Sequence, residues 1–232
     1  MSSRDIASNE MSSRRVLITG ASRGLGEAMA SAFAAGGAQL LTPSRRELDL
    51  SSPSSIAAFL ERHGDEVDVL INNAGINIVR SLEELDAQTW AEMVQINLTA
   101  PLQLLRGCAG GMKARGWGRV LNVSSILSVV AREGRASYSS VKAGLNGLTR
   151  SSALELAPFG VLVNALAPGY VETQLTRQNN PPEQLARIEA EIPQRRLAQP
   201  DEIAACALWL CGEANTYLTG QTIVVDGGWT LR

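Results

Sequence analysis

The sequence predicts an α/β fold in which one doubly wound parallel sheet is covered by helices on both faces. Short apolar runs recur along the chain, and none alternates strictly between apolar and polar residues. Such runs are typical of strands buried on both faces. Segments with helical spacing lie between them, as crossover connections require. The predicted strands are residues 16–18, 40–41, 67–71, 120–123, 161–166 and 223–225.

The segments between these runs show the apolar spacing of helices. The first places Leu25, Met29 and Phe33 at four-residue steps, so that they share one helix face. Residues 43–51, by contrast, form a stretch too short for a full crossover helix. The predicted helices cover residues 24–36, 86–114, about 138–157 and 201–211.

Length and composition favour one domain without metal. A chain of 232 residues fits a single domain that buries about 70–75% of its unfolded surface. Such a chain can form a core without disulfides or a structural metal. The single histidine, His63, and three cysteines distant from it in sequence do not make a convincing zinc site. We therefore expect no metal.

Charge and hydropathy argue against nucleic-acid binding and against a membrane-spanning segment. The net charge is −2 without a basic block, so no nucleic-acid footprint is expected. No apolar run reaches the roughly 18 residues of a membrane span. Residues 1–13 lack the apolar core of a secretory signal, and Asp5 and Glu10 argue against a transit peptide. We expect a disordered tail at residues 1–13, one domain at residues 14–232 and a cytoplasmic location.

A glycine-rich turn, TGASRGLG at residues 19–26, joins the first predicted strand to the first predicted helix. Backbone N–H groups at such a helix N-terminus bind anions. Gly20 permits a tight turn, Gly24 lets a diphosphate approach the backbone, and Gly26 lets the helix pack closely on the strand. The order of strand, turn and helix predicts a single-domain Rossmann-type sheet that binds a dinucleotide. A glycine-rich turn without a ligand is the alternative.

Charge near the second strand indicates the type of dinucleotide. An acidic residue at this place accepts hydrogen bonds from a ribose 2′-hydroxyl, whereas arginines pair with a 2′-phosphate. The second strand ends in LLTPSRR, with no Asp or Glu at its tip. Arg23 and Arg45 could converge on one phosphate, and Arg46 could replace Arg45. We therefore prefer NADP(H), without excluding NAD(H); the alternative is that these arginines are ordinary solvated charges.

A tyrosine and a lysine form the candidate reacting pair. Lys142 follows Tyr138 by four residues in YSSVK, so both lie on the same face of a helix. At about 4 Å, the ammonium attracts a phenolate by about 4 kcal/mol at an effective dielectric of 20. This equals roughly three pKa units before desolvation is subtracted. Tyr138 could then exchange a proton near neutral pH, although a structural surface pair would have the same spacing.

A serine at the end of the fourth predicted strand could bind the reacting oxygen. The strand ends in NVSS, and side chains at this edge of a parallel sheet face the ligand crevice. We choose Ser125 to stabilise the charge that develops on the substrate oxygen. Ser124 should point the other way, because side chains alternate along a strand. A serine that merely forms a turn is the alternative.

Together these motifs resemble the short-chain dehydrogenase/reductase family. The resemblance extends over nearly all of the chain after residue 13, and most closely to its 3-oxoacyl-[acyl-carrier-protein] reductase-like branch. The motifs are TGASRGLG, NNAG at residues 72–75, Asn97 in QINLTAP, Ser125, YSSVK, PGYVET from Pro168, and TGQTIVVDGG near the end of the chain.

The resemblance implies a catalytic tetrad of Asn97, Ser125, Tyr138 and Lys142. Tyr138 would be the acid in carbonyl reduction and the base in alcohol oxidation. Asn97 would hold a water that connects Lys142 to solvent. The implied cofactor-binding residues are Gly20, Ser22, Arg23, Gly24, Leu25 and Gly26 at the diphosphate, Arg45 at the ribose, Asp49 and Leu50 at the adenine, Asn73, Ala74 and Gly75 along the adenosine, Tyr138 and Lys142, and Pro168, Gly169, Val171 and Thr173 at the nicotinamide.

Two departures from the family pattern affect the expected function. The helix that the family normally inserts between Arg45 and Asp49 is missing, so the adenine side should be more open. The segment at residues 170–196, which covers the substrate in the family, has a predicted mobile tip at residues 179–182 and no cluster that indicates one substrate.

Three functions remain in competition. The first is an NADPH-dependent reductase acting on a small-molecule ketone such as a 3-oxoacyl thioester. The second is a dehydrogenase of a sugar, polyol or steroid alcohol, and the third is a non-catalytic nucleotide-binding sensor. In the family, the helices that begin near residues 86 and 138 pair between subunits, which implies a homodimer or homotetramer.

Overall fold

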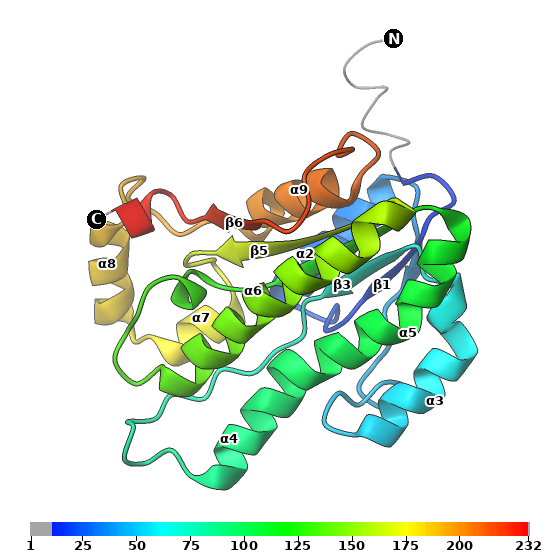
Figure 1. The fold of residues 1–232 in the computed structure, drawn as a ribbon. Helices are drawn as coiled ribbons and strands as arrows, with labels where there is room; N and C mark the ends of the chain where they lie inside the picture. The colour runs from blue at the N-terminus through cyan, green and yellow to red at the C-terminus, as the bar shows by residue number, and fades with distance from the viewer. Residues whose placement is uncertain (1–10, 232) are drawn as a thin grey trace, which may run out of the picture.

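A six-stranded parallel sheet is the centre of the computed structural model, which describes residues 11–231 (Figure 1). Its strand order is β2-β1-β3-β4-β5-β6. The predicted fold class is confirmed, and each predicted apolar run overlaps a strand, with bounds that differ by up to two residues. The strands are β1 (Arg15–Ile18), β2 (Gln39–Leu41), β3 (Val69–Asn72), β4 (Gly118–Val123), β5 (Val161–Pro168) and β6 (Thr222–Val225).

Helices cover both faces of this sheet, with α2 and α9 behind it and α4, α5 and α6 in front in the view of Figure 1. The strand order reverses direction between β1 and β3, and ligands of doubly wound sheets bind beyond the carboxyl ends of strands at such a point. The helices are α2 (Gly24–Ala35), α3 (Pro53–His63), α4 (Ala87–Val94), α5 (Ala100–Arg115), α6 (Ala136–Leu156), α7 (Gln174–Asn179), α8 (Pro182–Glu191) and α9 (Pro200–Cys211).

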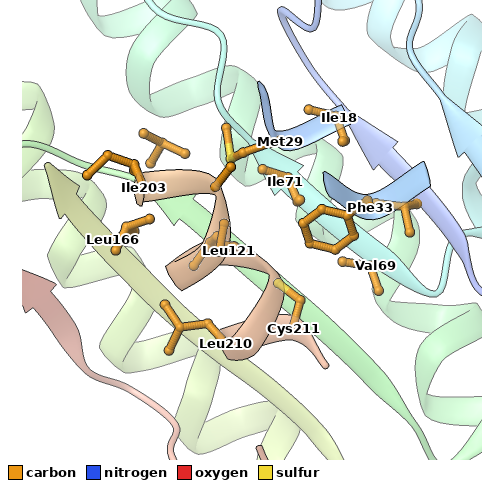
Figure 2. Close-up of a cluster of buried hydrophobic side chains, with 14 of the residues drawn as sticks. Ile18, Met29, Phe33, Val69, Ile71, Leu121, Leu166, Ile203, Leu210 and Cys211 are labelled. Carbon is orange, nitrogen blue, oxygen red and sulfur yellow. The ribbon is translucent and has the colours of Figure 1, made fainter. Parts of the chain in front are cut away.

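Alternate strand residues supply two apolar cores. Ile18, Ile71 and Leu121 face α2 and α9, where they pack with side chains such as Phe33 and Ile203 (Figure 2). Their neighbours Leu17, Leu70 and Val120 belong to the core on the other face, with residues of α3, α5 and α6. Because side chains of a strand alternate between faces, each apolar run contributes to both cores.

A buried chain of hydrogen bonds ties α6 to the sheet. Asn72 of β3 donates through Nδ2 to Asn122 Oδ1 of β4 at 2.8 Å, and Asn122 Nδ2 donates to Thr149 Oγ1 of α6 at 2.8 Å. The Thr149 hydroxyl in turn donates to the Leu145 carbonyl oxygen at 2.9 Å. These polar contacts fix the position of α6 along its own axis relative to β4.

The helix expected over residues 86–114 is interrupted. A π-helical turn at Gln95–Thr99 lies between α4 and α5. Apolar spacing did not reveal this turn, because a change from i→i−4 to i→i−5 hydrogen bonding leaves the burial pattern of the flanking helices intact. The interruption places Asn97 inside the turn.

The ordered domain begins before residue 14. Residues 1–10 of the predicted tail lie outside the described residues, but Met11 is fully buried against the first core, and its N–H donates to the Gly36 carbonyl oxygen at 3.0 Å. The prediction of a disordered tail is therefore wrong for residues 11–13. Burial of the Met11 side chain offsets the entropy lost in ordering this short segment.

Residues 42–52 contain turns and no helix before α3, in agreement with the short connection expected there. Among residues 11–231, no helix is both long enough and apolar enough to cross a membrane.

Candidate active site

The glycine turn has a shape that side chains would prevent. Gly20 and Gly24 have φ values of +68° and +56°, in the left-handed region that favours glycine. A Cβ at Gly26 would lie only 2.2 Å from the Gly20 carbonyl oxygen. The turn leads into α2, whose N-terminus receives no side-chain cap. Its free N–H groups and the positive end of the helix dipole fit a diphosphate.

The loop after β3 is attached to this turn. The Thr19 hydroxyl accepts hydrogen bonds from the N–H groups of Asn73 and Ala74, each at 3.0 Å. Asn73 Nδ2 donates to the carbonyl oxygens of Thr19 and Gly20 at 2.9 and 3.2 Å. The sequence interpretation assigned no role to Thr19. Its position could have indicated one, because a hydroxyl residue there follows β1 and directly precedes the first glycine of the turn.

Three cavities form a continuous series along the carboxyl ends of the strands. The largest, about 400 Å³, shares Gly75 and Ile76 with a middle cavity of about 170 Å³. The middle cavity shares Ser125 and Tyr138 with a third of about 120 Å³. An elongated dinucleotide can therefore extend from the first cavity into the second and present its reactive end beside the third.

Most of the predicted cofactor residues line the first two cavities. The large cavity is lined by Gly20, Ser22, Arg45, Asp49, Leu50, Ala74 and Gly75. The middle cavity is lined by Leu25, Asn73, Gly75, Tyr138, Lys142, Pro168, Gly169, Val171 and Thr173.

The two arginines expected at the ribose phosphate have different partners in the structure. Arg23 lies outside the linings of both cavities and donates through Nη1 to Gln174 Oε1 at 3.4 Å. Arg45 lines the large cavity, and its Nε lies 3.7 Å from Asp49 Oδ1. Glu47 lines it as well, and its carboxylate accepts hydrogen bonds from the Ser44 N–H and hydroxyl at 2.8 and 2.7 Å. The sequence interpretation overlooked this acid because it follows the strand tip by several residues.

Lys142 is buried one helical turn from Tyr138. Its Nζ donates to the Val123 carbonyl oxygen at 2.7 Å and lies 5.7 Å from the centre of the Tyr138 ring. Burial lowers the pKa of Lys142 to about 8. One of its three ammonium donors is thus occupied by β4, which leaves two for a ligand.

The expected lowering of the Tyr138 pKa is wrong for the protein without ligands. Burial raises the pKa of Tyr138 above its ordinary value, while the neighbouring Ser125 hydroxyl and the charge of Arg135 act in the opposite direction. Desolvation therefore outweighs the attraction of a nearby cation. The cation that lowers the pKa of Tyr138 is Arg135, at the N-cap of α6, rather than the lysine that the sequence interpretation selected.

The two serines after β4 face different surroundings. Ser125 lines the middle and small cavities, and its hydroxyl oxygen accepts a hydrogen bond from the Leu127 N–H at 3.2 Å. The Ser124 side chain is buried, and its hydroxyl donates to the Lys142 carbonyl oxygen at 3.4 Å. Both serines line the middle cavity, whereas only Ser125 also lines the small one, where it meets Tyr138.

Asn97 lies in the π-helical turn and is 1% exposed. Its Nδ2 donates to the carbonyl oxygens of Met93 and Ile76 at 3.0 and 3.2 Å, and its Oδ1 accepts from the Ile76 N–H at 3.3 Å. A Cβ at Gly75 would lie 2.6 Å from Asn97 Oδ1 and 3.6 Å from Lys142 Nζ. Gly75 therefore separates the amide from the ammonium by the width of one small residue.

The small cavity contains functional candidates that the sequence interpretation missed. Besides Ser125 and Tyr138, it is lined by Arg132 and Arg135 and, from the segment after β5, by Tyr170 and Asn180. The sequence feature that could have indicated them is the pair of arginines in AREGRAS, between Ser125 and Tyr138. In sequence they look like solvated charges of a loop, yet Arg135 is only 5% exposed.

The segment over the site includes a buried residue at the predicted mobile tip. Asn180, within the predicted mobile tip, is 4% exposed, and its Nδ2 donates to the Thr176 carbonyl oxygen at 2.8 Å. Ile188 and Ile192 pack in a separate apolar cluster that includes Tyr170 and Trp229. Of the apolar residues Leu175, Ile188 and Ile192 in this segment, only Leu175 lines the middle and small cavities. The described part of the chain has no group of three or more His, Cys, Asp or Glu side chains placed to hold a metal.

Comparisons with known proteins agree with this architecture. A family model described as Enoyl-(Acyl carrier protein) reductase matches residues 43–230. The 3-oxoacyl-[acyl-carrier-protein] reductase FabG of Vibrio cholerae serotype O1 is 36% identical over 91% of this chain and 95% of its own length.

Solved structures match over almost the whole chain. The gluconate 5-dehydrogenase of Burkholderia cenocepacia J2315, in complex with NADP and tartrate, has a TM-score of 0.93 at 28% identity, covering 98% of this chain and 99% of its own. A structure named a short chain dehydrogenase/reductase family protein has a TM-score of 0.87 at 30% identity, covering 95% and 99%.

Proposed function

This chain belongs to the short-chain dehydrogenase/reductase family and is an NAD(P)-dependent oxidoreductase, and we propose that it transfers hydride between NADP(H) and a small ketone or secondary alcohol. The observation that carries the proposal is the position of Tyr138, which lines both the middle cavity and the small one and is followed by Lys142 one helical turn later. The proton-transfer group thus lies between the place for the nicotinamide and the place for a substrate.

The residues of the site divide the chemistry among them. A bound nicotinamide supplies or accepts the hydride. Tyr138 gives its proton to the carbonyl oxygen during reduction and takes it back during oxidation. Ser125 donates a hydrogen bond to the same oxygen and stabilises the charge that develops there. Lys142 holds a positive charge near the phenol and uses its remaining donors on the cofactor, and Asn97 orders the path between Lys142 and solvent.

The preference for NADP(H) is supported by the large cavity. The Arg45 side chain is 79% exposed at its rim, so it is free to turn toward a 2′-phosphate. The Glu47 carboxylate is already engaged by Ser44, which leaves it less available to a ribose hydroxyl. Titration with NADPH and NADH tests this preference, and an affinity for NADH at least tenfold higher would contradict it.

Two substrate classes are candidates. A 3-oxoacyl thioester is favoured by the FabG relative at 36% identity. A sugar acid is favoured by the gluconate 5-dehydrogenase, whose structure holds NADP and tartrate. A panel of ketones and alcohols, followed by the absorbance of NADPH, distinguishes reduction of acyl thioesters from interconversion of hydroxy acids.

Replacement of the reacting phenol tests whether the protein is an enzyme. We expect Tyr138→Phe to abolish turnover with little change in NADPH affinity, because only the proton-transfer group is lost. Tyr217→Phe is the matched control, since Tyr217 is 94% exposed and should retain full activity. Turnover that survives in Tyr138→Phe would refute the assigned role. Tight NADPH binding without turnover in the unaltered protein would instead favour the nucleotide sensor.

The proposal includes a cytoplasmic homodimer or homotetramer. The side chains of Leu154 and Phe159, at the end of α6 and just beyond it, are 80% and 45% exposed, and Gly144 and Gly147 place small residues along the same helix. Exposed apolar and small residues of this kind suit helix pairing between subunits. Light scattering on the purified protein measures the assembly, and cell fractionation tests the location.

A further inference from the structure

The small cavity beside Ser125 and Tyr138 is positively charged. It is lined by Arg132 and Arg135, and no Asp or Glu is among its lining residues. The ion pairs found within residues 11–231 all join other side chains. Two guanidinium groups so close together repel each other, and burial together with the charge of Arg132 lowers the pKa of Arg135. A negative group in this cavity would relieve both effects.

The arginines are held in place by only part of their hydrogen-bonding capacity. Arg135 Nη1 donates to Asn77 Oδ1 at 2.7 Å. Arg132 Nη1 donates to the Tyr170 hydroxyl at 2.8 Å and to Asn180 Oδ1 at 3.5 Å. A guanidinium has five N–H donors. In each residue, Nε and Nη2 make no hydrogen bond to another group of the described chain, so both groups retain donors for a ligand.

The hydrogen-bond partners of these arginines come from two segments of the chain. Asn77 lies in the loop after β3, whereas Tyr170 and Asn180 belong to the segment over the site. All of them accept hydrogen bonds from a guanidinium without neutralising it, because none carries a charge. The positive charge of the pair is therefore positioned and remains available.

We propose that Arg132 and Arg135 bind a carboxylate of the substrate, and that the substrate is a short oxo acid interconverted with its hydroxy acid. The inference rests on the proposed oxidoreductase function and selects between its two substrate classes. Ser125 and Tyr138 line the same cavity as the arginines, so a compact molecule can place its carbonyl oxygen at the former and its carboxylate at the latter. The planar fork of an arginine matches a carboxylate with two parallel hydrogen bonds.

A neutral acyl thioester suits this cavity less well. It would leave the two partly buried cations of this cavity without a counter-ion. Burial of charge without a partner is unfavourable. The volume of about 120 Å³ is also more consistent with a short molecule.

Matched pairs of substrates test the charge requirement. We would assay NADPH oxidation with a 2-oxo, a 3-oxo and a 5-oxo acid, each beside its methyl ester, and with an N-acetylcysteamine thioester of 3-oxobutanoate. In the unaltered enzyme, at least one acid should exceed its ester in kcat/KM by about 10- to 100-fold, the range expected for a charge-assisted hydrogen bond. Equal or higher values for every ester, or for the thioester, would overturn the proposal while leaving the oxidoreductase function intact.

Substitutions assign the effect to the two arginines. Arg132→Gln and Arg135→Gln should each lower kcat/KM for the acid by about 10- to 100-fold more than for its ester. The effect of Arg135 on Tyr138 applies to both substrates, so the ratio of acid to ester isolates the carboxylate contact, and Arg135→Lys should recover part of the loss. Arg150→Gln makes the same change in net charge at an exposed position on α6 and should alter neither. Equal losses for acid and ester in both glutamine variants would count against a carboxylate site.

A binding measurement keeps the test independent of turnover. Malonate should raise the melting temperature of the unaltered protein, whereas dimethyl malonate should not, and both glutamine variants should lose the malonate response. If no compound of the panel is reduced, the proposed function fails, and the malonate response alone then decides whether the anion site exists. No shift with malonate in the unaltered protein would show that it does not.

Discussion

The substitution Gly26→Ala tests whether the glycine turn requires close packing against α2, because alanine would otherwise stabilise the helix. The Cβ of Gly26→Ala would lie 2.2 Å from the Gly20 carbonyl oxygen and 2.6 Å from Asn73 Nδ2. These contacts must lengthen by about 1 Å to reach van der Waals separation. Both neighbours are fixed, since Asn73 donates to the carbonyl oxygens of Thr19 and Gly20. Overpacking of this kind costs about 1–3 kcal/mol, despite the helix propensity of alanine.

Gly110→Ala is the matched control, because its Cβ would meet only Asp65 Oδ1, at 3.8 Å. Gly110 is exposed inside α5, where alanine is favoured over glycine by about 0.5–1 kcal/mol. Each kcal/mol shifts the melting temperature of a chain of this size by about 2–4 °C.

The two substitutions should therefore have opposite signs. By differential scanning calorimetry, we expect Gly26→Ala to melt about 2–12 °C lower and Gly110→Ala about 1–4 °C higher than the unaltered protein. Gly26→Ala should also weaken NADPH binding, measured by fluorescence titration, because the turn that binds the diphosphate is displaced. If Gly26→Ala melts at or above the unaltered protein with unchanged NADPH affinity, the close packing of turn and helix is not required.

Three further predictions follow from the structure. Ketone reduction should decline as the pH rises through about 8, where the buried Lys142 loses its proton; a pH profile of kcat/KM, which reports groups of the free enzyme, checks this, and a flat profile from pH 6 to 10 would contradict it. Leu121→Ala should lower the free energy of unfolding by about 2–5 kcal/mol, since Leu121 is fully buried, whereas Leu82→Ala should be nearly neutral at 77% exposure; urea denaturation compares them, and similar values would be inconsistent with the core described. Arg45→Asp should reduce the ratio of NADPH to NADH affinity by at least tenfold, because a carboxylate repels a 2′-phosphate, and an unchanged ratio would remove Arg45 from cofactor selection.

Much of the architecture could be predicted because burial leaves a direct trace in the sequence. Strands covered on both faces are predominantly apolar, and this pattern located β1, β3, β4 and β5. The edge strands β2 and β6 are only partly buried but also contain short apolar runs. The pair of Tyr138 and Lys142 was recognisable because the chain has few tyrosines and lysines, so their spacing stood out. The π-helical turn around Asn97 had no comparable trace, since its apolar spacing fits an uninterrupted helix.

The electrostatics of the site could not be predicted from spacing. Arg132 and Arg135 are indistinguishable in sequence from loop arginines that face water, and only the wall formed by Tyr170 and Asn180 makes them part of a cavity. The pKa of Tyr138 depends on desolvation, which is a property of the assembled site. Hydrophobic patterning therefore located the scaffold, while charge in an enclosed space required coordinates.

The polar contacts of Asn72, Asn122 and Thr149 have a mechanical consequence for the reaction. A shift of α6 by one helical turn would move it about 5.4 Å and leave the Asn122 amide and the Thr149 hydroxyl buried without each other as hydrogen-bond partners. Apolar contacts alone would tolerate a shift of α6 along the sheet, but these hydrogen bonds do not. Tyr138 and Lys142 also belong to α6, so these hydrogen bonds fix their position relative to the sheet. The sequence of the loop before α6 can therefore change, and with it the substrates that the site accepts, while Tyr138 and Lys142 keep their positions.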